Sequence, residues 1–404
     1  MDSGLAVDAA VLVGSLLLVI GAALSGAADR FRTPGLLLFL VLGMVVGDDG
    51  LGLISFDDPG LAQTLGVVAL IVILFEGGLS TSLDEARPVA APALLLATVG
   101  VLVTAAVVAG AVMVFADVGT TTALLIGAVV ASTDAAAVFA VLRKAPVPRR
   151  LALMLETESG ANDPMAVLLT VGILASWEGD PTTADWIAFG LRQLVGGVVI
   201  GIAVGWLAAA VLRRLSTDDN VLAPVLALGG AGLAYGLGTL VGASGFLAVY
   251  LAGLMVATAA PSKRRVVARF HEAMAAMAQI GLFLMLGLLV FPSQLPGVLG
   301  IGVVIAAALI LVARPLAIAL CLPWFGLGVR SNVFVAWAGL RGAVPIVLAT
   351  FPLTAGYPEG DTVFNAVFFV VLASATVQGL TIGPVAGKLG LSGERDVLSS
   401  DSDL

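Results

Sequence analysis

Two carboxylates and an amide stand close together inside a long apolar run, at residues 158–164, with the sequence ESGANDP. A carboxylate exposed to lipid is energetically very costly. Acids at this depth must therefore line a site that is enclosed by protein and accessible to water. These residue types point to the movement of ions or protons across a membrane.

The spacing within this segment separates two faces of a helix. Ser159 and Asp163 are four residues apart and share one face, whereas Glu158 and Asn162 share the adjacent face. The first face can present a hydroxyl and a carboxylate to a hard monovalent cation. The second face directs Glu158 towards a basic partner, and Arg341 is the basic residue that we expect to pair with it.

A helix interruption is expected around Arg341, where residues 339–345 have the sequence GLRGAVP. Pro345 lacks an amide hydrogen and removes the hydrogen bond to the carbonyl four residues before it. Freed carbonyls can bind cations, and the two half-helix ends carry opposite partial charges. Thr133 and Asp134 indicate a similar break, although no glycine or proline there forces one.

Competition between a proton and a cation is the chemistry that such a site permits. Burial disfavours the ionised form of a carboxylate, so the group can hold either a proton or a cation near neutral pH. If only one of the two is carried at each crossing, the protein exchanges protons for cations. This is antiport, which requires neither enzyme chemistry nor a cofactor.

The composition is typical of an integral membrane protein. The 404 residues are 60% hydrophobic and only 11% charged, with a mean hydropathy of +1.11, whereas a soluble domain is usually about 25% charged. The 49 glycines and 18 prolines predict close helix packing and broken helices. Cys321 is the single cysteine, which excludes an intramolecular disulfide and a cysteine–metal cluster.

We expect an all-α polytopic membrane protein with about thirteen transmembrane helices of roughly 17–25 residues. The spans are expected near residues 5–26, 34–47, 61–79, 88–115, 120–142, 151–176, 186–212, 221–242, 244–260, 270–291, 296–320, 331–354 and 363–387. Most of the 19 basic residues fall in alternate loops. The positive-inside rule then places the N-terminus outside the cell membrane and the C-terminus in the cytosol. The net charge of −8 lies largely in the outward loops and the C-terminal tail, so it indicates no nucleic-acid partner.

Four ionisable residues fall in one layer of this topology, near or just inside the midplane. At about 1.5 Å per residue, Asp134 lies roughly 20 Å from the outer end of its span. Asp163 lies roughly 18–20 Å from the inner end of its own span, and Arg341 about 15 Å into the twelfth. Glu76 lies in the inner part of the third span. This layer is the expected transport site.

Four motifs together resemble the monovalent cation/proton antiporter family. They are ESGANDP at 158–164, STDAAAVF at 132–139, LFEGG at 74–78 and GLRGAVP at 339–345. The resemblance covers nearly the whole chain. It is greatest to the Asn-Asp branch of the family, and within that branch to the bacterial potassium/proton antiporters.

The resemblance implies a role for each polar residue of the layer. Asp163 would be the principal carrier of the cation and the proton. Asp134, Thr133 and Ser159 would complete the coordination of the monovalent cation, and Glu76 would contribute directly or through water. Asp134 could instead cap a half-helix at the break.

Two further residues bear on stoichiometry and stability. Asn162 stands where electrogenic relatives have a second aspartate, so the resemblance implies electroneutral one-for-one exchange of K⁺ or Na⁺ for H⁺, with K⁺ favoured. Glu158 would pair with Arg341 and stabilise the core rather than bind ions.

The resemblance also implies a homodimeric fold with inverted repeats, in which unwound fifth and twelfth helices cross and a core moves against a dimerisation domain by an elevator-like step. The expected division is a core at about 88–176 and 296–387, dimerisation helices at about 5–79 and 186–291, a single transporter unit over 1–390, and a short acidic cytosolic tail at 391–404. Relatives in the potassium branch often continue into a cytosolic regulatory domain, whereas this sequence ends in the short acidic tail.

Other interpretations fit the residues less well. A cation channel is the main alternative, but no repeated carbonyl-filter sequence of the potassium-channel kind is present. An intramembrane protease would need a metal motif, which one histidine cannot supply, or an aspartyl dyad of Asp134 and Asp163, which the surrounding motifs do not favour. His271, the only histidine, is expected at the wet surface rather than as a pH sensor. Gly197, Gly201 and its neighbours are expected in close helix contacts, which could include the dimer face.

Overall fold

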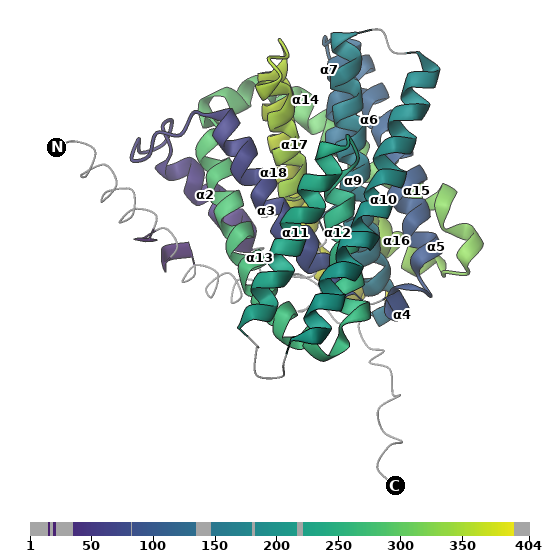
Figure 1. Cartoon of the computed structure of the whole chain (residues 1–404). Helices are drawn as coiled ribbons and strands as arrows, with labels where there is room; N and C mark the ends of the chain where they lie inside the picture. Colours follow the sequence, from purple (N-terminus) through teal and green to yellow (C-terminus); the bar gives the residue numbers. More distant parts are fainter. Residues whose placement is uncertain are drawn as a thin grey trace, which may run out of the picture.

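The computed structural model describes residues 15–16, 19–21, 35–81, 83–134, 147–179, 182–215 and 221–391, and all regular structure in these ranges is helical (Figure 1). The first half contains α2 (Gly35–Val46), α3 (Pro59–Ser80), α4 (Leu83–Ala86), α5 (Ala90–Leu95), the π-helical η1 (Leu96–Gly100), α6 (Val101–Phe115), α7 (Thr120–Val129), α9 (Arg149–Glu178) and α10 (Thr183–Arg214). The second half contains α11 (Leu222–Leu240), α12 (Gly245–Ala259), α13 (Pro261–Leu289), the short η2 (Pro292–Gln294), α14 (Leu295–Ala307), the π-helical η3 (Ala308–Ala313), α15 (Arg314–Cys321), the short η4 (Pro323–Phe325), α16 (Val329–Trp337), α17 (Ala343–Thr354) and α18 (Gly360–Lys388).

The all-α polytopic prediction is confirmed. Within the described ranges, seven helices are long and apolar enough to cross a bilayer, and four shorter apolar helices accompany them. α9 is equally long but carries the acidic residues of the predicted site. The predicted span at 5–26 lies mostly outside the described residues, and so does the part of the fifth span after residue 134.

Local sequence signals define where several helices begin. The Asp58 carboxylate accepts a hydrogen bond from the Leu61 amide at 3.0 Å, and Pro59 occupies the first turn of α3. Thr182 and Asp185 form a reciprocal capping box at the start of α10. Caps of this kind satisfy amides that have no partner within the helix, so they fix the helix starts.

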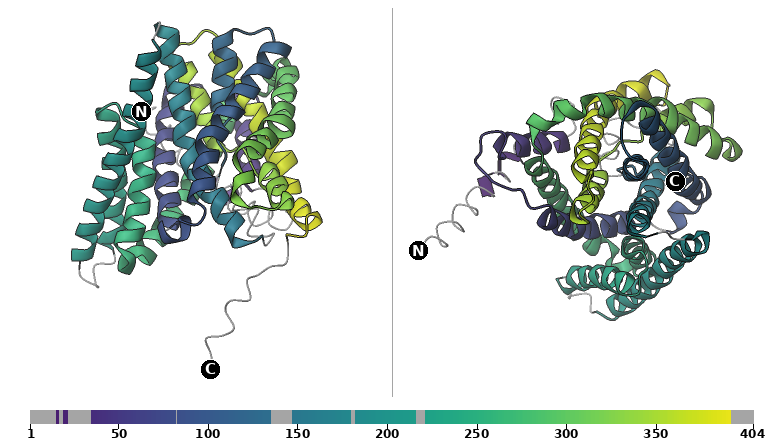
Figure 2. Two further views of the ribbon diagram at one scale, coloured as in Figure 1. Left: turned by 90° about the vertical axis from the view of Figure 1, so that its right-hand side faces the viewer. Right: turned by 90° about the horizontal axis from the view of Figure 1, so that it is seen from above.

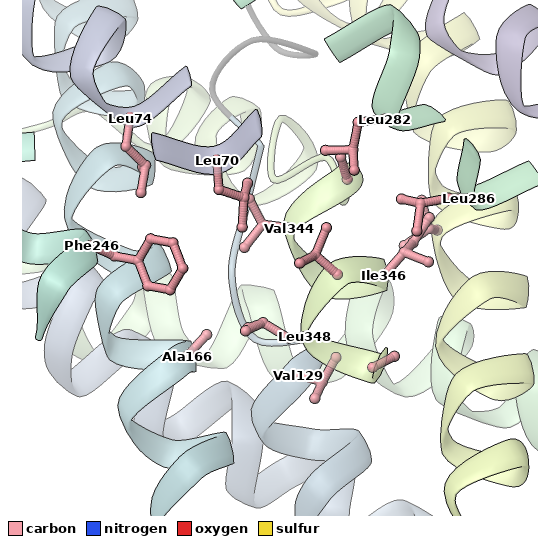
Figure 3. Packing of buried hydrophobic residues seen from close by; sticks show 14 of the residues in the cluster. Leu70, Leu74, Val129, Ala166, Phe246, Leu282, Leu286, Val344, Ile346 and Leu348 are labelled. Carbon is pink, nitrogen blue, oxygen red and sulfur yellow. The ribbon is translucent and has the colours of Figure 1, made fainter. Parts of the chain in front are cut away.

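α3 runs through the middle of the molecule. Figure 2, seen from above, shows α10, α11 and α12 gathered on one side of α3, while α17 and α18 lie on the other side. α3 contacts both α12 and α17. Leu70 and Leu74 of α3 pack in the same apolar core as Val344 and Leu348 of α17 (Figure 3). Most of α17 is buried, which fixes the short helix that follows the predicted break.

Small residues allow α10 and α12 to pack closely within one chain. A Cβ atom added at Gly201 would lie 2.7 Å from the Ala248 carbonyl oxygen, and one at Gly205 would lie 2.8 Å from that of Ala252. A Cβ at Gly197 would similarly approach the Ser244 carbonyl at 2.9 Å. The prediction of close helix contacts is therefore confirmed. These glycines face α12 of the same chain and not a second copy, because the backbone of α12 already covers the face of α10 on which they lie.

Candidate cation and proton site

Two interrupted helices meet at the centre of the site. α7 ends at Val129 and the chain is non-helical to Asp134, while α16 ends at Trp337 and α17 begins only at Ala343. The Asp134 amide donates a hydrogen bond to the Leu340 carbonyl at 2.8 Å, which joins the two non-helical segments. The break expected around Arg341 is thus present, and α7 ends just before Thr133 and Asp134, where the other break is expected; the continuation after Asp134 lies outside the described residues.

Each segment supplies a charge to the other half-helix. The Arg341 guanidinium donates to the Ala131 carbonyl at 2.7 Å and also to the Ser132 carbonyl, just beyond the C-terminal end of α7. The Asp134 carboxylate accepts from the Ala343 amide at 3.4 Å, at the N-terminal end of α17. Because the C-terminal end of a helix is partially negative and the N-terminal end partially positive, both interactions are favourable. Asp134 therefore caps α17.

Gly342 is required for this arrangement. A Cβ atom at Gly342 would overlap the Asp134 carboxylate. The glycine therefore allows the carboxylate to reach the start of α17, and it explains why the predicted break carries a glycine directly after Arg341.

A hydroxyl and amide cluster connects α9 to the segment before Asp134. Thr133 Oγ1 lies 2.8 Å from Ser159 Oγ and accepts a hydrogen bond from Asn162 Nδ2 at 2.7 Å. The Thr133 amide donates to Asn162 Oδ1 at 3.3 Å. All three side chains are buried. The structure thus brings together three of the predicted site residues, and it commits the Asn162 side chain to holding the broken segment.

Asp163 lies beside this cluster with unused hydrogen-bonding capacity. The residue is only 6% exposed, and its Oδ1 makes no hydrogen bond within the described part of the chain. Ser132 Oγ is likewise buried without a hydrogen bond to any described residue. Asp134, Ser132 and Arg341 are the charged and polar neighbours of the Asp163 carboxylate. Buried polar atoms normally have partners, so two orphaned oxygens indicate a place for a proton or a cation.

A proline at the next position adds a freed carbonyl to the same helix. Pro164 lies inside α9 and has no amide hydrogen, so the Gly160 carbonyl loses its usual helical partner. A Cβ atom at Gly160 would overlap the Tyr250 ring, so α9 and α12 approach closely at this turn. The available donors around Asp163 are all oxygens, which suits a hard monovalent cation.

The expected pair of Glu158 with Arg341 is wrong. Glu158 forms a two-pronged ion pair with Arg314, in which Nη2 donates to Oε2 at 2.9 Å and Nη1 donates to Oε1. Arg314 begins α15, directly after the π-helical η3. Arg341 instead donates through Nη1 to the carbonyls of Ala131 and Ser132. The signal that could have identified Arg314 is a basic residue inside the apolar span predicted at 296–320.

Two polar residues of α18 hold the second break and were not predicted. Ser374 Oγ accepts a hydrogen bond from the Arg341 amide at 3.0 Å and donates to Gln378 Oε1 at 2.6 Å. Gln378 Nε2 donates to the Trp337 carbonyl at 2.9 Å, at the end of α16. Ser374 and Gln378 are four residues apart on a mostly apolar helix, which is the sequence signal for a shared polar face.

The remaining predicted residues lie on α3 and α13. Glu76 lies on α3 and is partly buried. His271 is completely buried, and its ring packs 5.0 Å from that of Phe75, so the expected surface position of the histidine is wrong. The apolar side of α13 faces α3 at this point, and the Val267 carbonyl lies 2.8 Å from the histidine Nδ1.

Comparison with known proteins supports the reading of this geometry. A family model described as "Sodium/hydrogen exchanger, transmembrane" matches residues 15–388. A K⁺/H⁺ antiporter of Alkalimonas amylolytica is 41% identical over 96% of this chain and 68% of its own length. A K⁺/H⁺ antiporter of Shewanella sp. (strain ANA-3) is 39% identical over 93% of this chain and 66% of its own length. The chain thus spans about two thirds of these relatives.

The fold is shared with a solved structure. The sodium proton antiporter structure from Methanocaldococcus jannaschii superposes with a TM-score of 0.84 at 24% sequence identity, covering 96% of this chain and 99% of that one. The match confirms the antiporter fold that the four motifs imply. On the match to the family model and the identity to the two antiporters, the chain belongs to the sodium/hydrogen exchanger family of transmembrane cation/proton antiporters.

Proposed function

We propose that this antiporter exchanges K⁺ for H⁺, with Na⁺ as the alternative cation, and that both ions compete for Asp163. The observation that carries the proposal is the buried Asp163 Oδ1, which has no hydrogen-bond partner in the described residues and lies near Ser132 Oγ. Two relatives named K⁺/H⁺ antiporters support the choice of K⁺. The family description keeps Na⁺ as the competing assignment.

The other polar residues take supporting roles in this proposal. Ser132, Ser159 and the freed carbonyl of Gly160 are candidate ligands that reach the cation together with Asp163. Asp134 lies close enough to assist, while its carboxylate also caps α17. Thr133 and Asn162 position the segment before Asp134, and Glu76 contributes from α3.

Electroneutral exchange follows from the charge inventory at this site. The carboxylate of Glu158 is neutralised by Arg314. The positive charge of Arg341 faces the C-terminal end of α7, and the negative charge of Asp134 faces the N-terminal end of α17, so each charge is balanced by a helix end. Asn162 carries no charge and is hydrogen-bonded to Thr133. Asp163 is then the group whose charge changes with its cargo, so one cation replaces one proton and the cycle moves no net charge.

The arrangement of charged loops supports the proposed topology. At the end of the bundle that carries α4, Glu85 forms ion pairs with Arg149 at 3.5 Å and with Arg264 at 3.8 Å. Acidic residues such as Asp49 and Glu359 lie in loops at the opposite end. We assign the basic end to the cytosol by the positive-inside rule. A homodimer, and a core of α5–α9 and α14–α18 that moves against α2–α3 and α10–α13, complete the proposal.

Proteoliposomes that contain an internal pH dye test this function. External K⁺, Na⁺ or Li⁺ is added in turn with the membrane potential clamped, and the cation that moves protons at the lowest concentration identifies the preferred substrate. Asp163→Asn should abolish proton movement. Asp361→Asn, the same change at an exposed carboxylate in the first turn of α18, is the matched control and should leave it intact.

Three outcomes would contradict the proposal. Proton movement that persists in Asp163→Asn would remove this residue as the carrier. Cation flux without proton movement would favour the channel. A rate that follows the membrane potential would refute one-for-one exchange.

A further inference from the structure

A hollow of about 390 Å³ opens between α9 and α10 near their connection, away from the transport site. Gly172 and Ser176 of α9 line one wall, and Trp186, Phe189 and Arg192 of α10 line the other. A Cβ atom at Gly172 would lie 2.5 Å from Trp186 Cζ3, so the glycine lets the indole lie against α9. The Trp186 and Phe189 rings meet edge to face at 6.3 Å. We refer to this feature as the α9–α10 hollow.

Arg192 is a cation in the wall of the α9–α10 hollow. Its side chain is exposed on a helix whose neighbouring outer positions, Leu191 and Val195, are apolar and also exposed. Its guanidinium forms no hydrogen bond or ion pair with any residue in the described ranges. A guanidinium offers a planar set of donors that matches two phosphate oxygens, so an anion of this type is its natural partner.

We infer that Arg192 lies at the bilayer–water boundary. The next residue, Gln193, accepts a hydrogen bond from the Ser244 amide at 3.1 Å, in the turn that joins α11 to α12. A Cβ atom at Gly242, in the same turn, would lie 3.2 Å from Arg192 Cζ. A turn between two apolar helices lies where the hydrocarbon ends, and tryptophan is enriched at the same level. Trp186 is consistent with this placement.

Asp185 places a negative charge on the water side of Arg192. It lies seven residues earlier on α10, two turns along the same face, or about 10 Å along the axis. Its Oδ2 accepts hydrogen bonds from the Thr182 amide at 2.8 Å and from Thr182 Oγ1 at 2.7 Å. Its Oδ1 makes no hydrogen bond within the described residues and can accept one from a ligand. Helical side chains lean towards the N-terminus, which brings the Arg192 guanidinium closer to this carboxylate.

We propose that the α9–α10 hollow binds a phospholipid with a primary-amine headgroup, of the phosphatidylethanolamine class. In a membrane the phosphate of such a lipid lies deeper and the ammonium nearer to water, which is the order of Arg192 and Asp185. The phosphate binds the guanidinium, and the ammonium donates to Asp185 Oδ1. The glycerol and the first part of an acyl chain lie against Trp186 and Phe189.

The same chemistry disfavours other membrane lipids. An anionic lipid without an amine would bring its charge near the Asp185 carboxylate and gain nothing from Oδ1. A choline headgroup has no N–H to donate to that oxygen. The selectivity therefore depends on both charged residues, whereas the affinity depends mainly on Arg192.

Thermal unfolding of the delipidated full-length protein in detergent tests the site. The unfolding midpoint is measured against rising concentrations of phosphatidylethanolamine, phosphatidylglycerol, phosphatidylcholine and the soluble headgroup glycerophosphoethanolamine. Phosphatidylethanolamine should stabilise at the lowest concentration. Arg192→Ala should raise its half-saturating concentration about tenfold or more, the effect of losing a charge-assisted hydrogen bond.

Two further variants separate the headgroup contacts from the fold. Asp185→Asn keeps an oxygen that can cap α10 and should remove the preference for phosphatidylethanolamine over phosphatidylglycerol. Arg87→Ala, an exposed arginine in the segment between α4 and α5, should change nothing. Equal half-saturation by phosphatidylglycerol in the unchanged protein, or no effect of Arg192→Ala, would overturn the proposal. Equal stabilisation by glycerophosphoethanolamine would show that the acyl chains contribute nothing, which would refute a lipid ligand and indicate a site for a free phosphoamine.

Discussion

The ion pair of Glu158 and Arg314 makes a quantitative prediction about stability. Glu158 is 0% exposed and Arg314 is 4% exposed, and two parallel hydrogen bonds join them. Replacing either residue leaves the other as an uncompensated buried charge, which typically costs about 3–5 kcal/mol. Glu158→Gln and Arg314→Gln should therefore each destabilise the protein strongly. The double variant should be less destabilised than the sum of the two single variants, because it removes both charges of the pair and leaves neither one uncompensated.

Reversible unfolding in mixed micelles with increasing SDS measures this coupling. The double-mutant cycle for Glu158 and Arg314 should give a coupling energy of about 2–3 kcal/mol, at the upper end of the values for residues in contact. The cycle for Glu158 and Arg341 should give less than about 1 kcal/mol. The reverse order would refute the assignment and restore the pair expected from the sequence. A Glu158→Gln protein that is stable but inactive would place Glu158 in the transport pathway.

Three further predictions concern the breaks and an outer loop. Gly342→Ala should lower stability by about 1–3 kcal/mol through the overlap with Asp134. Adding Asp134→Ala removes that overlap, so the double variant should be less destabilised than the sum of the two single variants. Gln378→Ala should reduce the maximal exchange rate of proteoliposomes, whereas Thr376→Ala, at an exposed position of the same helix, should not; equal losses would refute the role of Gln378 in holding the break. The Ser293 amide donates to the Asp49 carboxylate at 2.6 Å and lowers its pKa. This contact stabilises the fold above about pH 4, the ordinary pKa of an aspartate, and its contribution is lost as the pH falls further. The unfolding temperature of Asp49→Asn should thus fall less below pH 4 than that of the unchanged protein.

Much of the fold follows from hydropathy and from backbone chemistry. The seven long helices coincide with predicted spans because a bilayer demands a minimum apolar length. The break before α17 was predictable from Gly342 and Pro345, since both residues weaken a helix. The break after α7 carries no such residue in the sequence, and the structure shows its cause. Arg341 binds carbonyls just beyond the end of α7 and Asp134 binds the start of α17, so each non-helical segment is stabilised by a contact between distant parts of the chain.

The site was predictable where its residues lie on one element. Ser159, Asn162 and Asp163 share the polar side of α9, so their spacing alone brought them together. The partner of Glu158 was not predictable in this way. The choice between Arg314 and Arg341 depends on which helix packs against α9 and on what else the guanidinium can bind, and spacing along one helix gives neither. The burial of His271 was missed for the same reason, since the face that α13 turns to α3 is a tertiary property.

The balance of buried charges argues for a single carrier. Arg341 is held by the carbonyls beyond α7, Asp134 meets the amide end of α17, and Glu158 is matched by Arg314. A charge that is already balanced gains little when a cation arrives, because the cation would first have to displace its partner. Asp163 has an oxygen with no hydrogen bond in the described structure, so binding a cation or a proton there displaces no partner. This balance of charges supports the proposal that Asp163 is the single carrier of the cation and the proton.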